Sequence, residues 1–161
     1  LLGRVLSLQL LEEIREKLGE SYSPSAGVSL SSIYPDFGRI SVASNVDVKQ
    51  MAVTQQAIFA IAKQLRDQPI TEDLLDRARK PLLEASAKSR RENSYWLAYV
   101  STATSKADRL DRINKAEDEL RKTTPADIQR LAQLYLLDDK AVVIKAISDK
   151  AAAPAPAASA D

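Results

Sequence analysis

Two hydrogen-bond donors, Arg15 and Tyr22, lie on either side of a predicted helix end. Apolar residues recur at helical spacing up to this end: Leu10, Leu11, Ile14 and Leu18. Gly19 follows as the residue best able to adopt the left-handed conformation that ends a helix. Arg15 then lies in the last turn and Tyr22 just beyond the end, so a guanidinium and a phenol on different backbone elements can converge on one point. Taken alone, the two residues also fit simpler roles, as a cation near a helix C-terminus and as a half-buried aromatic at a strand entry.

The chain contains neither histidine nor cysteine, which limits its chemistry. Catalytic zinc lacks a plausible ligand set, and Ser-His and Cys-His nucleophile pairs are impossible. A general base acting near neutral pH would have to be a carboxylate, a lysine or a tyrosine with a shifted pKa. We therefore expect that the chain is not a hydrolase by itself.

The composition is that of one ordinary globular domain, with 161 residues, of which 45% are hydrophobic and 28% charged. The formal net charge of +1 gives no overall field that favours nucleic acid or an anionic membrane. No apolar run approaches the roughly 20 residues that span a bilayer. We expect neither a nucleic-acid partner nor a membrane partner.

Other chemically capable clusters have plainer interpretations. Tyr95, Trp96 and Tyr99 are expected to form a packing anchor in the core rather than a binding cage. Three acidic pairs are interpreted as exposed helix faces, a helix first turn and a surface loop rather than as catalytic or metal sites: Glu12/Glu13, Glu72/Asp73 and Asp138/Asp139. The short basic run at 88–91 fits a solvated helix face.

The first elements predicted after the helix are two strands and another helix. Small residues over 26–33 and an alternating pattern over 38–46 predict strands, with Ile40, Val42 and Val46 on one face. Pro, Asp and Gly between them favour an antiparallel hairpin. Asp47 is expected to cap a helix that ends at Pro69 and lies on the sheet.

Helices dominate the rest of the chain. Thr71 is expected to cap a helix in which Pro81 causes a kink or break, and a charged helix follows over 106–121. Thr124 and Pro125 mark the start of a last helix, and the β-rich stretch 141–147 is predicted to form a closing strand. We therefore predict an α/β domain of α+β type over 1–149, with helices on one face of a small, mostly antiparallel sheet. An Ala/Pro-rich tail over 150–161 is expected to be disordered.

Several of these stretches together resemble the C-terminal homologous domain of the pitrilysin/insulinase metallopeptidases, the inverzincins. The stretches, in chain order, are Leu11-Glu-Glu-Ile-Arg15 with Gly19 and Tyr22, Pro69-Ile-Thr71, Arg91-Glu-Asn-Ser-Tyr-Trp-Leu97 and Thr124-Pro-Ala-Asp-Ile128. The resemblance covers 1–147 and is nearest to bacterial pitrilysin-like members. The spacing of Arg15, Gly19 and Tyr22 is its most specific part.

The resemblance implies one half of a clamshell peptidase. In that family the N-terminal half carries a His-x-x-Glu-His zinc site, and the C-terminal half supplies residues that contact the substrate. Arg15 and Tyr22 match the positions that donate hydrogen bonds to the carbonyl or developing oxyanion of the scissile peptide, where a preset donor contributes on the order of 3 kcal/mol. This chain matches only the second half and lacks the zinc motif, so zinc is expected only in a parent protein and the chain is expected to be inactive in isolation.

The resemblance also implies particular partners and leaves an alternative open. The expected partners are a zinc-bearing N-terminal half and a peptide substrate, and family habit favours the periplasm. The alternative is a non-catalytic subunit that pairs with an active homologue. A third expectation is that an open sheet edge or apolar patch drives self-association of the fragment.

Overall fold

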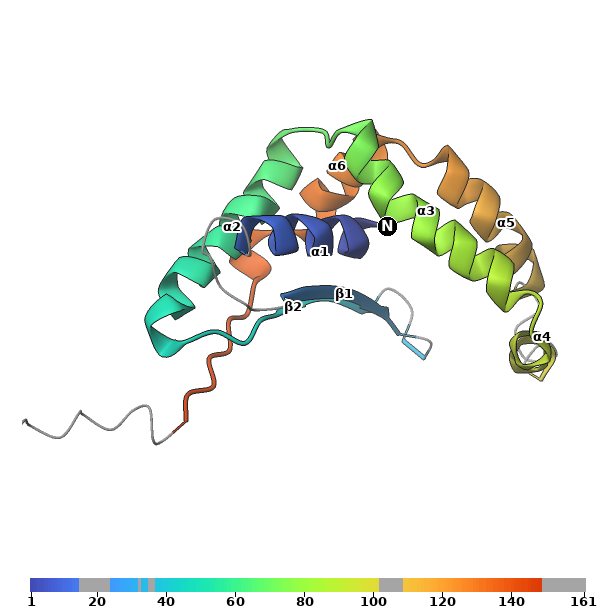
Figure 1. The fold of residues 1–161 in the computed structure, drawn as a ribbon, viewed down its shortest axis with the longest axis horizontal. Helices are drawn as coiled ribbons and strands as arrows, with labels where there is room; N and C mark the ends of the chain where they lie inside the picture. The colour runs from blue at the N-terminus through green and yellow to red at the C-terminus, as the bar shows by residue number, and fades with distance from the viewer. Residues whose placement is uncertain (15–23, 32, 35–36, 102–108, 149–161) are drawn as a thin grey trace, which may run out of the picture.

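The computed structural model describes residues 1–14, 24–31, 33–34, 37–101 and 109–148. The elements in chain order are α1 (Leu2–Glu12), β1 (Ser25–Leu30), β2 (Gly38–Ala43), η2 (Val48–Gln50), α2 (Met51–Asp67), α3 (Glu72–Ser89), α4 (Asn93–Val100), α5 (Arg109–Lys122), α6 (Pro125–Tyr135) and η3 (Asp138–Lys140), where η marks a single 3-10 turn. In Figure 1 the other helices form an arch over the sheet, and α1 lies between the arch and the strands. This mostly helical arrangement with a two-stranded antiparallel sheet confirms the predicted α+β class.

Helix α1 forms the centre of the core because one of its faces is apolar along its whole length. Val5 and Leu10 have no exposed surface, and Leu6 is 1% exposed. The helix contacts β1, α2, α3 and α6. Burying a leucine of this kind stabilises a fold by about 1.5–3 kcal/mol relative to leaving it in water. The N-terminal helix is therefore the element that the other elements cover.

The two strands form the predicted hairpin, in a register that pairs Ser25 with Ala43 and Leu30 with Gly38. Ile40 and Val42 are half-buried, while the residues between and beside them are exposed, so the predicted alternation of faces is confirmed. The second strand ends at Ala43, three residues before the predicted end. Alternation fixes which side chains face the helices but does not fix where hydrogen bonding stops.

Helices α2 and α3 begin with different capping arrangements. Thr71 caps α3 as predicted, because its Oγ1 accepts a hydrogen bond from the Leu74 amide at 3.2 Å. Asp47 precedes η2 but makes no side-chain capping bond, so that prediction was wrong. The 3-10 turn explains the difference, since it adds three residues between Asp47 and the start of α2. Helix α3 continues past the exposed Pro81 to Ser89, so it is not broken there.

Helix α6 begins with a complete capping box. The Asp127 amide donates to the Thr124 hydroxyl at 3.3 Å, and the Thr124 amide donates to the Asp127 carboxylate at 3.0 Å. Pro125 occupies the first helical position, where no amide hydrogen is needed. These residues give the predicted start of the last helix. Ile128 and Ala132 then bury one face of it against the core.

The closing strand predicted over 141–147 does not form. Residues 141–148 are exposed and belong to neither a helix nor a strand. A strand needs a hydrogen-bonded neighbour, and the sheet of the described residues consists only of β1 and β2. Beyond η3 this segment leads away from the arch of helices (Figure 1).

Two further predictions concern the C-terminal tail and the presence of membrane-spanning helices. The tail over 150–161 lies outside the described residues, and the division at 149/150 stays a prediction. Within the part of the chain that the structure describes, no helix is long and apolar enough to span a bilayer.

Candidate functional site

Arg15 and Tyr22, the predicted substrate-binding residues, lie outside the described residues. The described residues that flank them are both buried. Ile14 directly precedes Arg15 and has no exposed surface, and Pro24 follows Tyr22 by two positions and is buried. The described chain is thus buried at Ile14 and at Pro24, on either side of residues 15–23.

Direct contacts between helix α1 and strand β1 set the relative position of the chain on either side of residues 15–23. The Ser7 hydroxyl donates to the Ala26 carbonyl at 2.9 Å and accepts from the Ala26 amide at 2.9 Å. Gly3 permits the close approach of helix and strand, because a Cβ at that position would lie 3.0 Å from Cγ2 of Val28. The backbone geometry on both sides of the predicted site is therefore set by direct contacts between α1 and β1.

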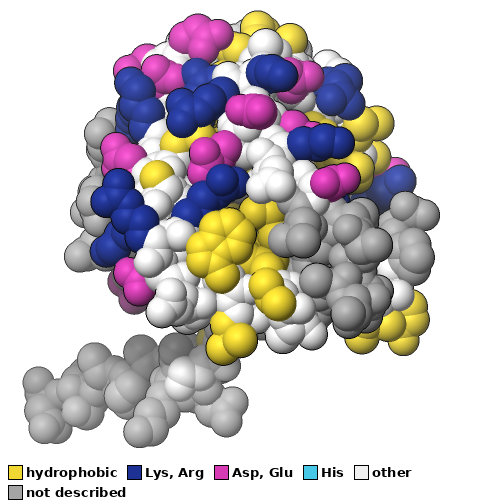
Figure 2. All heavy atoms as spheres, turned by 90° about the vertical axis from the view of Figure 1, so that its right-hand side faces the viewer, with side chains coloured by type: hydrophobic (Ala, Val, Ile, Leu, Met, Phe, Trp, Pro, Cys, Tyr) yellow, Lys and Arg dark blue, Asp and Glu magenta, His cyan; other side chains and the backbone are white. Residues whose placement is uncertain are grey.

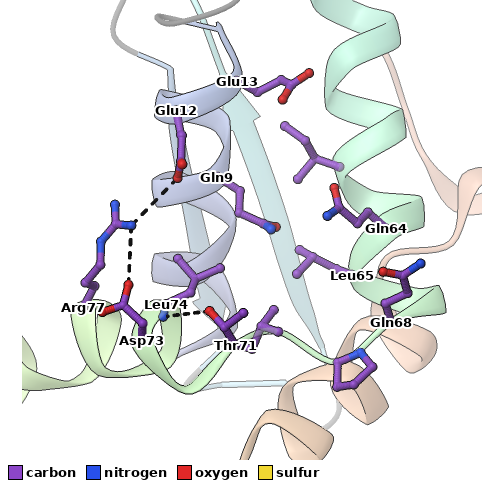
Figure 3. Close-up of a pocket in the computed structure, with 13 residues that line it drawn as sticks. Gln9, Glu12, Glu13, Gln64, Leu65, Gln68, Thr71, Asp73, Leu74 and Arg77 are labelled. Carbon is purple, nitrogen blue, oxygen red and sulfur yellow. Dashed lines mark hydrogen bonds and ion pairs between the residues drawn. The ribbon is translucent and has the colours of Figure 1, made fainter.

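A polar hollow opens beside the C-terminal end of α1 (Figure 3). Its volume is about 560 Å³, and it is bounded by α1, the second half of α2, the α2–α3 connection and the first turns of α3. Its apolar residues are Ile61, Leu65, Pro69, Ile70 and Leu74. Its polar lining is richer: Gln9, Gln64, Gln68, Glu12, Glu13, Thr71, Asp73 and Arg77. Three side-chain amides, one from α1, one from α2 and one from the residue that follows α2, therefore face a shared space.

The charged side chains at the rim of the hollow are exposed and interact only weakly with one another. Arg77 Nη1 lies 3.9 Å from Glu12 Oε2 and 3.9 Å from Asp73 Oδ2, and all three side chains are at least half exposed. Solvent screens such pairs, which contribute at most about 1 kcal/mol. Gln9 is different, because its Oε1 is buried without a hydrogen-bond partner among the described residues. This oxygen can accept a hydrogen bond from a donor that enters the hollow.

The hollow does not fit a zinc ion. No histidine or cysteine is present in the chain, and no three acidic side chains of the described ranges are grouped so as to hold a metal. Of the rim carboxylates, Glu12 and Asp73 both face Arg77 (Figure 3). The chemistry that the described residues offer at this point is hydrogen bonding to a polar ligand.

The aromatic cluster predicted to lie in the core is at the surface. Tyr95 contacts Trp96 and Tyr99 edge to face, with ring centroids 5.3 and 4.6 Å apart. Helix α4 nevertheless has no buried residue, and Trp96 is 40% exposed. Desolvation, followed by the neighbouring Tyr99, raises the pKa of the Tyr95 hydroxyl. The core interpretation was wrong because aromatic spacing shows only which side chains share a helix face.

Hydrophobic side chains also gather on the face shown in Figure 2, below a band of mixed basic and acidic side chains. This is the side on which α4 lies in Figure 1. Leu97 and Val100, next to the aromatic residues on α4, are 70% and 62% exposed. The aromatic residues are thus part of a wider exposed apolar area.

The acidic pairs and the basic run are mostly as predicted. Glu72 and Asp73 lie in the first turn of α3, and Asp139 is exposed in η3. Two residues have larger roles than the sequence suggested. Asp138 is paired with Arg66 of α2, and Arg90 donates to the Ile113 carbonyl of α5 at 2.9 Å. Both connect elements that are distant in sequence.

Sequence reasoning did not find the hollow. Its amides come from positions 9, 64 and 68, and no local pattern relates the first of these to the other two. The usable signal was a polar residue within an apolar helix, since Gln9 lies between Leu8 and Leu10. That signal marks a polar position near the core but does not identify its neighbours.

Comparison with known proteins gives one match. A family model described as the Peptidase M16 inactive domain matches residues 1–82, which is half of the chain. This range contains α1, the hairpin, α2 and the predicted donors Arg15 and Tyr22. No curated protein matches, and no solved structure matches.

Proposed function

The chain belongs to the M16 peptidase family, as an inactive C-terminal domain, and from this premise we propose that it is the substrate-clamping part of a zinc-dependent endopeptidase. The zinc site in this proposal lies on an N-terminal half of the same peptidase. The two halves enclose a peptide, and this chain contributes hydrogen-bond donors rather than the reactive groups. Among members of the family, we propose that bacterial pitrilysin-like proteins are the nearest.

The observation that carries the proposal is the family match over 1–82, because it includes both Arg15 and Tyr22. The description of the matched domain as inactive agrees with the prediction that this chain does not catalyse hydrolysis alone. The polar hollow beside the end of α1 also offers chemistry consistent with a binding role, since its amides can pair with the N–H and C=O groups of a peptide.

Arg15 and Tyr22 have defined roles in this proposal. A guanidinium and a phenol both donate hydrogen bonds, and neither needs to change its protonation state to do so. Donors preset toward a carbonyl that becomes an oxyanion stabilise the transition state more than the bound substrate. The burial of the described residues Ile14 and Pro24, one before and one after the two donors in sequence, supports this role.

The test replaces Arg15 with alanine in the complete peptidase, with its zinc-bearing half present. We expect the kcat for a peptide substrate to fall by about 10²–10³-fold with a smaller change in KM, as for loss of one oxyanion donor. Arg15→Lys keeps the charge but loses the planar fork and should restore only part of the rate. Arg91→Ala, at an exposed arginine between α3 and α4, is the control.

Two outcomes bear directly on this assignment. Wild-type kcat and KM in Arg15→Ala would rule out a substrate role for Arg15. A large rise in KM at unchanged kcat would instead show that the residue binds substrate and transition state equally. Tyr22→Phe, which removes only the hydroxyl, tests the second donor in the same way, through its effects on kcat and KM.

The alternative is a non-catalytic subunit that pairs with an active homologue. The description of the matched domain as inactive favours it as much as it favours a clamping half. The two proposals differ in the parent protein, which contains a His-x-x-Glu-His motif in the same polypeptide only in the first case. Determining the sequence that precedes this chain therefore separates them.

A further inference from the structure

Ser7, on α1, makes two hydrogen bonds to a single residue of β1. Its hydroxyl donates to the Ala26 carbonyl and accepts from the Ala26 amide, each at 2.9 Å and in a partly buried setting. A hydroxyl carries one donor hydrogen and two acceptor lone pairs, so one small side chain can satisfy both backbone groups. Serine is a poorer helix former than alanine, so helix propensity does not explain a serine in the middle of α1. The contact with Ala26 gives this serine a role that alanine could not fill.

The backbone groups of Ala26 that Ser7 binds are those that point away from β2. The Ser31 amide, just after β1, bonds to the Phe37 carbonyl at 2.8 Å, and the register pairs each odd-numbered residue of β1 with an odd-numbered residue of β2. Antiparallel strands bond at every second residue, so the even-numbered Ala26 has no ladder bond to β2. Removing the Ser7 hydroxyl would therefore leave an amide and a carbonyl of Ala26 without the partner that the structure gives them.

Helix α1 lies close enough to β1 for its position along the strand to matter. A Cβ at Gly3, about one helical turn before Ser7, would lie 3.0 Å from Cγ2 and 3.6 Å from the amide nitrogen of Val28. The apolar contacts that bury α1 are not directional, so they resist separation more than sliding. Hydrogen bonds have narrow limits of distance and angle. The two bonds of Ser7 are therefore well suited to set the position of α1 along β1.

The position of α1 along β1 bears on the two predicted donors because these lie between the two elements in sequence. Helix α1 ends at Glu12 and β1 begins at Ser25. Arg15 comes three positions after the first, and Tyr22 three positions before the second. Two donors can stabilise one developing oxyanion only if both are correctly placed, and a misplacement of about 1 Å can cost 10²-fold in rate. We therefore expect a shift of α1 along β1 to change the rate.

We propose that Ser7 is a positioning residue: its hydroxyl fixes α1 along β1 and thereby sets where Arg15 lies relative to Tyr22. The inference rests on the proposed function, in which both donors bind the scissile peptide. Ser7 does not touch the substrate in this arrangement, and it acts through the backbone of Ala26. Both hydrogen bonds join α1 and β1 directly, and both elements lie inside the range that the family model matches.

The first test replaces Ser7 with alanine in the complete peptidase. We expect the kcat for a peptide substrate to fall by about tenfold or more with a smaller change in KM, because a misplaced donor binds the transition state less well. Thr124→Ala is the matched control, since it removes a hydroxyl that also bonds to a backbone amide but lies at the start of α6. Urea unfolding gives the folded fraction, and rates are compared per folded molecule. Equal losses in the two variants would show a general stabilising role and overturn the proposal.

The second test combines Ser7→Ala with Arg15→Ala and separates this inference from the proposed function. Without the guanidinium, nothing remains for Ser7 to place relative to Tyr22, so Ser7→Ala should lower kcat by less than about twofold in that background. A wild-type kcat in Arg15→Ala alone would refute the proposed function. An impaired Arg15→Ala beside a wild-type Ser7→Ala would refute the positioning role alone, as would equal fold-losses from Ser7→Ala in the two backgrounds.

Amide hydrogen exchange tests the contact itself. The Ala26 amide should exchange faster in Ser7→Ala because its acceptor is gone, whereas the neighbouring Gly27 amide, at an odd-numbered ladder position, should keep its protection. Ser7→Thr keeps the hydroxyl and should restore both the protection of Ala26 and the kcat. Unchanged protection of the Ala26 amide in Ser7→Ala, or restored protection in Ser7→Thr without recovery of kcat, would overturn the proposal.

Discussion

Arg66, in the last turn of α2, connects that helix to the residues that follow α6. Its guanidinium donates to the Leu136 carbonyl and, at 2.7 and 3.0 Å, to both carboxylate oxygens of Asp138. Its own carbonyl accepts from the side-chain amides of Gln129 and Gln133 at 3.1 and 3.0 Å. The arginine side chain is only 17% exposed. One residue thereby connects α2 to α6 and to η3.

Replacing Asp138 with asparagine should change how stability depends on pH. The hydrogen bond from Arg66 lowers the pKa of Asp138 below its ordinary value, which is about 3.9 in an unfolded chain. The folded state thus favours the ionised form, and the stabilisation is present above about pH 4 and is lost as the pH falls through the lowered pKa. Asp138→Asn should reduce the free energy of unfolding near pH 7 and flatten its fall in acid. Urea unfolding at several pH values measures both.

The control for this change is Asp139→Asn, an exposed neighbour in the same turn. It should leave both stability and acid dependence close to those of the wild type. The pKa values of Asp76 and Asp127 are also lowered, by Arg79 and Thr124 respectively, so some acid dependence remains in every variant. An unchanged profile in Asp138→Asn would show that the pair with Arg66 does not persist in solution.

At the scale of elements, the structure follows the sequence where a local signal sets the outcome. The hairpin was predictable from alternation on either side of a stretch that contains Pro35, Asp36 and Gly38, and α6 from Thr124 and Pro125. The structure of residues 141–147 and the exposure of α4 were not predictable in this way. β-Branched alternation predicts a strand only if a neighbour is present, and the aromatic spacing on α4 does not say what covers it. Both failures depend on contacts between elements.

Replacing Thr124 with alanine should destabilise the fold by about 1 kcal/mol, because the cap of α6 loses its side-chain acceptor. Removing the hydroxyl should also raise the pKa of Asp127, since Thr124 is the first cause of its lowered value. Thermal unfolding and carboxyl titration by NMR measure the two effects. Thr123→Ala is a matched control, because the Thr123 hydroxyl bonds back to the Glu119 carbonyl of α5. Equal losses in the two variants would exclude a specific capping role.

At the scale of the whole molecule, the sequence predicted the order of helices and strands better than it predicted the candidate functional site. The helix, hairpin and helices that the structure describes fit the order typical of the resembled family, and the match over 1–82 supports it independently. The donors Arg15 and Tyr22 stay a prediction. The polar hollow beside the C-terminal end of α1 arises only when α1 is packed against α2 and α3, because Gln9 is far in sequence from Gln64 and Gln68.

The last prediction concerns α1, the helix that contacts β1, α2, α3 and α6. Leu10 has no exposed surface and belongs to the cluster that joins α1 to α2, α3 and α6. Leu10→Ala should lower the free energy of unfolding by about 2–5 kcal/mol, through lost burial and the cavity left behind. That loss is a large part of the 5–15 kcal/mol typical of a domain. Leu134→Ala, at a leucine that is 54% exposed, should cost far less.

Because Arg15 follows the end of α1 by three positions in sequence, the same substitution tests whether the core positions the predicted donor. In the complete peptidase, measured well below its unfolding temperature, Leu10→Ala should reduce kcat as well as stability, since a misplacement of about 1 Å can cost 10²-fold in rate. Urea unfolding gives the fraction folded, and the rate is then expressed per folded molecule. A variant that loses stability but keeps the wild-type rate per folded molecule would show that the donor's position does not depend on the packing of α1.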